Sequence, residues 1–267
     1  MNFLLTALLF FGLNNYIFAE FDNLGRLIDY PGKIEVSCPA QNSSVGVVLV
    51  IGQSNSGNHG QKKFMSHYPT KVYNFYNGKC YMAASPLLGT TGVNGEFMTP
   101  FADYLIDFGV YKQVIIVPSG MNGTKISFWQ KEARLNTMLM GVINKLNLKY
   151  QLTEIVWHQG ESDWLEKTPD EDYKKAFYSL LSTLRTDINN IPFYYAIATR
   201  CGDNWIKDNS IAMMQRTFSN EQNKIYLAID TDSLVETNER IDGYCHFNEI
   251  GQLKTAYSYA MAIYLHH

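Results

Sequence analysis

Five runs of apolar residues, rich in β-branched side chains, alternate with helical patterns along this chain of 267 residues. The runs are residues 45–51, 114–117, 154–157, 193–197 and 225–229. Continuous apolar runs of this length, bounded by turn residues, are typical of strands buried on both faces of a sheet. The alternation predicts parallel strands joined by right-handed crossovers, and therefore a three-layer α/β/α sandwich around a five-stranded parallel sheet.

The segments between these runs have the pattern of helices, and one of them has the pattern of a hairpin. Helices are expected near residues 99–108, 131–148, 169–187, 209–221 and 248–265. An extra hairpin is expected over residues 71–82, because Asn77-Gly78 is a strong signal for a two-residue turn. Nothing in the pattern divides the chain further, so residues 20–267 are expected to form a single domain.

Residues 1–19 resemble a secretory signal peptide. An apolar run over residues 3–11 precedes a small residue, Ala19, after which cleavage is expected. The run is shorter than the roughly 20 residues needed to span a bilayer, so we favour cleavage over an uncleaved anchor and expect no stable membrane insertion. The chain is therefore predicted to be secreted or periplasmic.

The charge balance limits the kinds of partner. Twenty-two Lys and Arg against 25 Asp and Glu give a formal net charge of -3, and no basic block is present to neutralise phosphates. A nucleic-acid partner is therefore not expected. The oligomeric state stays open at this stage.

The four cysteines, Cys38, Cys80, Cys201 and Cys245, are an even number in a chain expected to be exported, which favours disulfides. None of them has metal-ligand spacing, so no metal site is predicted. Four cysteines allow three connectivities. The positions of the expected elements favour Cys38 with Cys80, next to the first strand and the hairpin, and Cys201 with Cys245, after the fourth and fifth strands.

Chemically useful side chains follow three of the predicted strands, at the edge where such sheets bind ligands. Ser54 stands in a tight turn after the first strand, although Gly- and Asn-rich stretches of this kind are also ordinary turns. His158 and Gln159 follow the third strand, and His158 has the pattern of a packing or solvent-facing residue. Asp242 and His246 follow the fifth strand. A Ser, an Asp and a His at one sheet edge favour catalysis over capping.

These blocks resemble those of the SGNH hydrolases, and more narrowly the sialate O-acetylesterase-like carbohydrate esterases. The matching stretches are Gly52-Gln53-Ser54-Asn55, residues 157–163 and residues 242–246, and residues 119–129 resemble a Gly-rich stretch that ends in Trp. The similarity covers roughly residues 45–265.

The resemblance implies a flavodoxin-like fold, no metal or other cofactor, and hydrolysis of short acyl esters on sugars through an acyl-enzyme. By position, Ser54 is the nucleophile, His246 the general base and Asp242 the group that orients His246. This division fits the chemistry, because a serine hydroxyl is a poor nucleophile until a neighbouring imidazole takes its proton.

The resemblance also implies three donors to the developing oxyanion. They are the backbone N–H of Ser54, the N–H of a glycine within residues 89–95, and the side-chain amide of Gln159. Gly95 is preferred because a helical pattern begins soon after it, and Gly92 fits almost as well. Glu161 is expected to tie its loop together.

The last block departs from the SGNH pattern, in which Asp stands three residues before His, because Asp242 stands four residues before His246. A bulge eased by Gly243 would absorb the extra residue. Otherwise His246 works in a dyad or with Asp230 or Asp232, which end the fifth strand.

The leading prediction is an exported esterase that removes O-acetyl groups from a carbohydrate, such as an acetylated sialic acid or another glycan. Trp129, Trp164 and Trp205 are candidates for stacking on sugar rings. The alternatives are an SGNH lipase or thioesterase with a long acyl tunnel, and a catalytically weak sugar-binding protein, which only the spacing of Asp242 favours.

Overall fold

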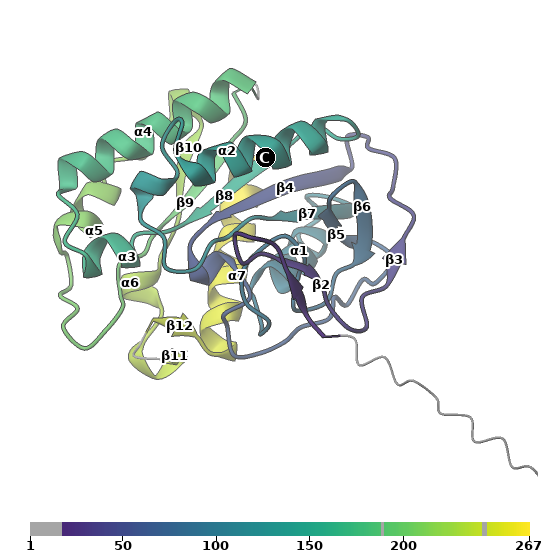
Figure 1. Cartoon of the computed structure of the whole chain (residues 1–267), viewed down its shortest axis with the longest axis horizontal. Helices are drawn as coiled ribbons and strands as arrows, with labels where there is room; N and C mark the ends of the chain where they lie inside the picture. Colours follow the sequence, from purple (N-terminus) through teal and green to yellow (C-terminus); the bar gives the residue numbers. More distant parts are fainter. Residues whose placement is uncertain (1–17, 188–189, 242–244) are drawn as a thin grey trace, which may run out of the picture.

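The computed structural model describes residues 18–187, 190–241 and 245–267. Its centre is an eight-stranded sheet with the strand order β10-β9-β8-β4-β7-β5-β6-β3 (Figure 1). The strands of this sheet are β3 (Glu35–Val36), β4 (Val45–Gly52), β5 (Val72–Tyr76), β6 (Lys79–Met82), β7 (Gln113–Pro118), β8 (Glu154–His158), β9 (Phe193–Ile197) and β10 (Ile225–Asp230). Two small antiparallel sheets pair β1 (Glu20–Phe21) with β2 (Leu27–Asp29), and β11 (Arg240–Ile241) with β12 (His246–Phe247).

Helices cover both faces of the large sheet, which confirms the predicted α/β sandwich. The α-helices are α1 (Met98–Asp107), α2 (Arg134–Asn147), α3 (Glu161–Leu165), α4 (Asp170–Asp187), α5 (Ser210–Gln215), α6 (Thr231–Leu234) and α7 (Glu249–His266). The 3-10 helices are η1 (Ser54–Ser56), η2 (Ile126–Phe128), η3 (Glu221–Asn223) and η4 (Thr237–Glu239). Figure 1 shows α2 and α4 on one side of the sheet and α1 and α7 on the other.

The central strand β4 shows why the sequence lacks the alternation of a half-exposed strand. All eight of its residues are buried. Val47 and Leu49 pack in the core on the side of α2 and α4, whereas Val48 and Val50 pack in the core on the side of α1 and α7. A strand covered on both faces needs apolar side chains at every position.

The predicted number of five strands is wrong. The five predicted strands are β10, β9, β8, β4 and β7, which lie side by side and pair in parallel. The expected hairpin is also present as β5 and β6, but it joins the same sheet, because β5 pairs in parallel with β7. β3 then pairs with β6 and completes the edge. Turn chemistry predicts a hairpin without indicating which strand it pairs with.

Two helical segments also differ from expectation. The helix predicted over residues 209–221 ends at Gln215, after which the chain turns and Phe218 stacks on Phe177 with ring centroids 4.0 Å apart. The short helix α3 was not predicted, because five residues are too few to show a helical period.

Both predicted disulfides are confirmed, with Cys38 joined to Cys80 and Cys201 joined to Cys245. Within the described part of the chain, no helix has the length and apolar character needed to cross a membrane. The predicted signal peptide falls almost wholly on residues outside the described ranges and stays a prediction.

Candidate active site

Ser54 lies where β4 gives way to the 3-10 helix η1, at the carboxyl edge of the sheet. Gly52 adopts a φ of +127°, and a Cβ on it would lie 2.1 Å from the carbonyl oxygen of His158 on β8. Only glycine allows this close approach of the two strands together with this backbone angle. Ser54 follows in the tight turn with 4% of its surface exposed.

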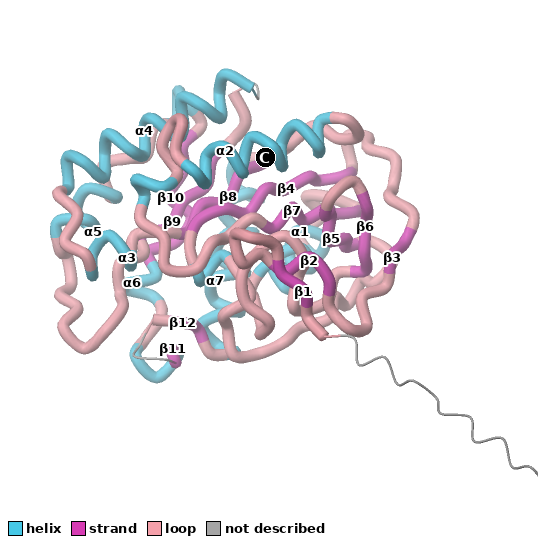
Figure 2. The backbone as a smooth tube through the Cα atoms, viewed as in Figure 1, coloured by secondary structure: helices cyan, strands magenta, loops and turns pink. Residues whose placement is uncertain are grey.

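His246 lies on β12, which contacts η1, so the structure brings the predicted nucleophile and the predicted base to the same edge. His246 pairs with Ile241 on the neighbouring strand β11. Figure 2 shows this small sheet among the loops beside α6. Asp242 follows Ile241 in the sequence and lies outside the described residues, as do its neighbours Gly243 and Tyr244.

The substitute acids, Asp230 and Asp232, are engaged elsewhere. Asp230 pairs with Arg216 at 3.0 Å and accepts a hydrogen bond from the Ser233 N–H at 3.1 Å. Asp232 is buried, and burial raises its pKa despite hydrogen bonds at 2.8 Å from the backbone N–H groups of Thr199 and Arg200. In the ranges that the structure covers, neither carboxylate is bonded to His246.

A second imidazole, which the sequence did not point to, lies beside His246. The rings of His59 and His246 stack with centroids 5.4 Å apart and planes at 29°. His59 Nε2 lies 3.1 Å from the hydroxyl of Thr91. His59 follows η1 within a few residues, but a lone His in a Gly- and Asn-rich loop has no distinctive sequence pattern.

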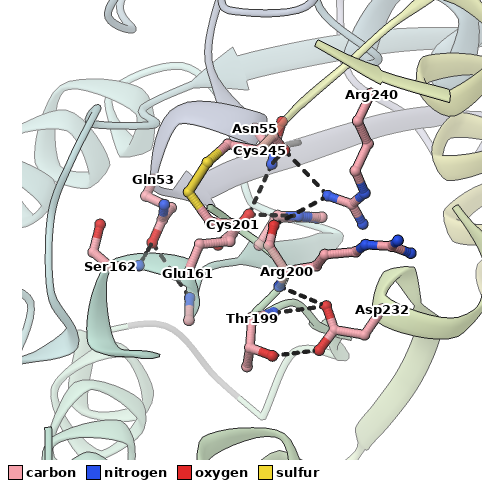
Figure 3. Close-up of a disulfide and its surroundings, with 12 residues drawn as sticks. Gln53, Asn55, Glu161, Ser162, Thr199, Arg200, Cys201, Asp232, Arg240 and Cys245 are labelled. Carbon is pink, nitrogen blue, oxygen red and sulfur yellow. Dashed lines mark hydrogen bonds and ion pairs between the residues drawn. A yellow bond between two sulfur atoms is a disulfide. The ribbon is translucent and has the colours of Figure 1, made fainter. Parts of the chain in front are cut away.

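The residues on either side of Ser54 are fixed to the beginning of α3 (Figure 3). Gln53 Oε1 accepts a hydrogen bond from the Ser162 N–H at 3.0 Å, and Asn55 Nδ2 donates to Glu161 Oε1 at 2.7 Å. These contacts join the turn after β4 to the helix after β8. Glu161 therefore ties this loop together, as expected.

Glu161 and His158 form a buried pair, with His158 Nε2 and Glu161 Oε1 3.5 Å apart. Burial alone would raise the pKa of Glu161, but its contacts with His158 and Asn55 outweigh burial and lower that pKa. His158 is fully buried and packs against the rings of Phe97, Phe247 and Tyr259. It is therefore a packing residue and not a solvent-facing one.

The amide of Gln159, the predicted oxyanion donor, is occupied in this structure. Its Nε2 donates to the carboxylate of Asp163 and, at 3.0 Å, to the carbonyl oxygen of Thr124. An amide nitrogen carries two hydrogens, so both are used. Gln53 Nε2, in contrast, has no acceptor in the described part of the chain, although Gln53 directly precedes Ser54.

The N–H of Gly95, the glycine expected in the oxyanion hole, is also already hydrogen-bonded. The Gly95 N–H donates to the Gly60 carbonyl oxygen at 2.9 Å, and a Cβ on Gly95 would lie 1.7 Å from the carbonyl oxygen of Lys62. Gly95 is thus needed for close packing, and its N–H is not free for an oxyanion. The N–H of Gly92, the alternative, has no acceptor among the described residues, and a Cβ there would lie 2.9 Å from His59 Nε2. Of the two glycines, Gly92 is therefore the one whose N–H has no acceptor among the described residues.

The three tryptophans proposed for sugar stacking differ in accessibility. Trp129 is fully buried, and Trp205 lies under the guanidinium of Arg200, 4.8 Å from its ring centroid. Trp164 lines a hollow of about 460 Å³, together with Asp163 and Asn204. Trp164 therefore borders an open hollow, whereas Trp129 is a core residue.

The arrangement has the components of acyl transfer. A serine hydroxyl at a sharp turn, an imidazole on the adjoining strand and nearby backbone N–H groups are the parts that covalent ester hydrolysis uses. In residues 18–187, 190–241 and 245–267, no group of three His, Cys, Asp or Glu side chains is arranged to hold a metal ion.

Solved structures with the same fold include several esterases. A protein from Arabidopsis thaliana is 16% identical, with a TM-score of 0.65 over 85% of this chain and 99% of that one. NanS is 13% identical, with a TM-score of 0.60 over 84% and 97% of the two chains. The family 3 carbohydrate esterase of Clostridium thermocellum is 15% identical, with a TM-score of 0.52 over 83% and 98%. At these identities the likeness shows the fold alone. A comparison with curated protein sequences finds no match.

A family model described as "Carbohydrate esterase, sialic acid-specific acetylesterase" matches residues 44–265. The match covers more than four fifths of the chain and includes Ser54, α3 and His246. It begins at the first strand of the parallel core and ends within the last helix. The chain belongs to this family of carbohydrate esterases and is a carbohydrate O-acetylesterase.

Proposed function

We propose that this esterase removes O-acetyl groups from an acetylated sialic acid or another acetylated glycan, through a Ser54–His246–Asp242 triad. The observation that carries the proposal is the contact between η1 and β12, which brings Ser54 and His246 to one edge of the sheet. The family supports an acetylated carbohydrate as the substrate.

In the proposed reaction, His246 takes the proton of the Ser54 hydroxyl as the oxygen attacks the acetyl carbonyl carbon. The tetrahedral intermediate collapses when His246 returns this proton to the sugar oxygen and the ester C–O bond breaks. Water then attacks the acetyl-serine with His246 as the base. Acetate leaves, and the serine hydroxyl is restored.

Asp242 is the carboxylate proposed to orient His246. Ile241, the residue before Asp242, pairs directly with His246 across β11 and β12. Asp230 and Asp232 are committed to Ser233, Arg216 and the backbone around Thr199, which leaves Asp242 as the best candidate. A carboxylate in this role holds the imidazole in the productive tautomer and stabilises the imidazolium.

The proposed oxyanion donors are the backbone N–H groups of Ser54 and Gly92 and one side-chain amide. Gln159, the original choice, must first release Asp163 or Thr124 to donate. Gln53 is the stronger candidate, because Ser162 holds its Oε1 while no described residue accepts from its Nε2. Removal of one such donor costs about 10² to 10³ in rate in comparable hydrolases, so Gln53→Leu and Gln159→Leu can be compared directly.

The proposed location is outside the cytoplasm, in the secreted or periplasmic fraction. Two disulfides are typical of proteins that fold in an oxidising compartment, and the first 19 residues resemble a signal peptide. Amino-terminal sequencing of the exported protein is expected to begin at Glu20.

The test of the function is acetate release from a panel of O-acetylated sialosides and other acetylated glycans, with esters of increasing acyl length in parallel. We expect acetate from at least one glycan and a strong preference for acetyl over longer acyl groups. Faster cleavage of long acyl esters would favour the lipase or thioesterase alternative. Sugar binding without acetate release would favour the binding-protein alternative.

A further inference from the structure

The backbone carbonyl of Cys245, directly before His246, is held by side chains from two distant parts of the chain (Figure 3). Asn55 Nδ2 donates to this oxygen at 3.0 Å and Arg240 Nη1 at 3.1 Å. We infer that Asn55 and Arg240 are positioning residues, which fix the imidazole of His246 relative to Ser54. The inference rests on the proposed function, because it concerns the geometry of that same pair.

The peptide unit that is held is the one that begins His246. The carbonyl of Cys245 and the backbone N–H of His246 belong to the same planar group, so a clamp on this oxygen also fixes the start of the His246 residue. The side chain of Cys245 is fixed as well, through its disulfide to Cys201. His246 is thus anchored through the peptide unit that joins it to Cys245.

Asn55 connects this peptide to the nucleophile. It follows Ser54 directly and is 4% exposed. One hydrogen of its amide goes to Cys245 and the other to Glu161 Oε1 at 2.7 Å. A single buried side chain therefore joins the nucleophile turn, the beginning of α3 and the peptide of the catalytic base.

Arg240 is the second residue that holds this carbonyl. Among the described residues, its buried guanidinium donates to four backbone carbonyl oxygens, those of Cys245, Arg200, Val235 and Thr231. Burial lowers the pKa of Arg240 to about 10, so the group is still charged at neutral pH. The planar fork of an arginine can reach several carbonyls at fixed angles, which the single ammonium of a lysine cannot do.

The effect on the reaction follows from the precision that proton transfer needs. A general base has to lie within hydrogen-bond distance of the hydroxyl that it deprotonates. A displacement of about 1 Å caused by a change away from the reacting atoms can cost about 10² in rate. Loss of either clamp is therefore expected to lower kcat and to leave substrate binding largely unchanged.

The test compares Asn55→Ala, Arg240→Met and Arg240→Lys with the wild type on an acetyl ester. Asn136→Ala and Arg216→Met are the matched controls, because Asn136 is another buried asparagine bonded to a backbone carbonyl and Arg216 is an arginine on the surface. We expect kcat to fall about 10²-fold for Asn55→Ala and Arg240→Met, with KM within about twofold. Arg240→Lys should be intermediate, and both controls should stay within about threefold of the wild type.

A double variant separates a positioning role from an unspecific disturbance of the folded structure. Because Asn55 and Arg240 act on the same oxygen, the combined loss in Asn55→Ala/Arg240→Met should be smaller than the product of the single losses. The losses in Asn55→Ala/Arg216→Met should multiply. Circular dichroism and thermal unfolding identify folded variants, and if Arg240→Met does not fold, Asn55→Ala and Arg240→Lys provide the result.

Three results would overturn the positioning role. They are losses no larger than those of the controls, an effect on KM alone, and fully multiplicative losses in the Asn55/Arg240 double variant. A wild-type chain that releases acetate from no ester would overturn the proposed function and this role with it. An active wild type with fully active variants would overturn the positioning role alone.

Discussion

The two disulfides close segments of nearly equal length, with sequence separations of 42 and 44 residues, in very different surroundings. Cys38–Cys80 fastens the outer antiparallel edge of the sheet, and Cys80 is fully buried in the apolar core beside Tyr150. Cys201–Cys245 lies among Asn55, Arg200 and Arg240 at the carboxyl edge (Figure 3). Similar cross-links therefore lie in different settings: one holds a sheet edge together, and the other holds the peptide before His246, the proposed catalytic base.

The contrast extends to the side chains around each disulfide. Polar groups that are almost fully buried gather at the carboxyl edge of the sheet, namely Gln53, Asn55, His158, Gln159, Glu161, Asp163 and Asp232. Burial of such groups costs stability unless they are hydrogen-bonded, and here most of them bond to one another or to backbone. The edge near Cys38 is secured mainly by apolar packing and strand pairing. Changes at the two regions should accordingly separate effects on catalysis from effects on stability.

The largest expected effect is the loss of activity in Ser54→Ala and in His246→Ala. Removal of either member of a serine triad costs about 10⁶ in kcat in a comparable hydrolase, because the two groups act as a unit. The free energy of unfolding should change little in Ser54→Ala, since the side chain is small. Ser43→Ala, at an exposed position near Cys38, is the control and should be fully active. Full turnover by Ser54→Ala, measured as acetate release, would exclude the serine mechanism.

The next effect in size is that of Asp242→Asn. If Asp242 orients His246, kcat/KM should fall by about 10⁴, as it does when the orienting carboxylate of a serine triad is replaced. Asp230→Asn is the matched control at the same edge and should lose less than tenfold. A loss of less than roughly tenfold in Asp242→Asn, about 1.4 kcal/mol of transition-state stabilisation, would remove Asp242 from the triad.

Removal of the disulfides tests the comparison directly. By the loop-entropy model, removal of either disulfide lowers the free energy of unfolding by about 4 kcal/mol. The two variants to compare are Cys201→Ser/Cys245→Ser and Cys38→Ser/Cys80→Ser. We expect kcat/KM to fall about 10²-fold in the first variant, because the peptide of His246 loses one of its anchors. The second should stay within about threefold at temperatures where both are folded. Denaturant unfolding measures the stability of each variant alongside its activity. Equal kcat/KM values in the two variants would show that the Cys201–Cys245 disulfide has no special role in catalysis.

The smallest effect is expected for Trp164→Ala. Trp164 lies on α3 and lines the hollow that Asp163 and Asn204 also border. Loss of one stacking ring should raise KM for an acetylated glycan about tenfold, which corresponds to about 1.4 kcal/mol. Hydrolysis of 4-nitrophenyl acetate, which has no sugar, should be unchanged. Equal losses on the two substrates would show that Trp164 does not contribute to sugar binding.

Much of the fold could be read from local patterns. The buried strands β4 and β7 to β10, the hairpin at Asn77-Gly78 and both disulfide pairings were predicted correctly. The strands and the hairpin follow from apolar runs and turn residues within short segments. The disulfide pairings follow from the order of those segments along the chain. The pairing of β5 with β7 was missed, because pairing partners in a parallel sheet are set by contacts between segments distant in sequence.

The sequence by itself determined which residues gather at the carboxyl edge of the sheet, since strand order and turn chemistry are encoded locally. Only the tertiary structure decided which of them are free to act. Hydrogen bonds across the fold engage Gln159 Nε2 and the Gly95 N–H, and they leave Gln53 Nε2 and the Gly92 N–H without acceptors among the described residues. Asn55 meets Glu161 and Cys245, which lie 106 and 190 residues away along the chain. Such partners depend on distances of a few tenths of an ångström in the packed molecule, and no local pattern in the sequence records them.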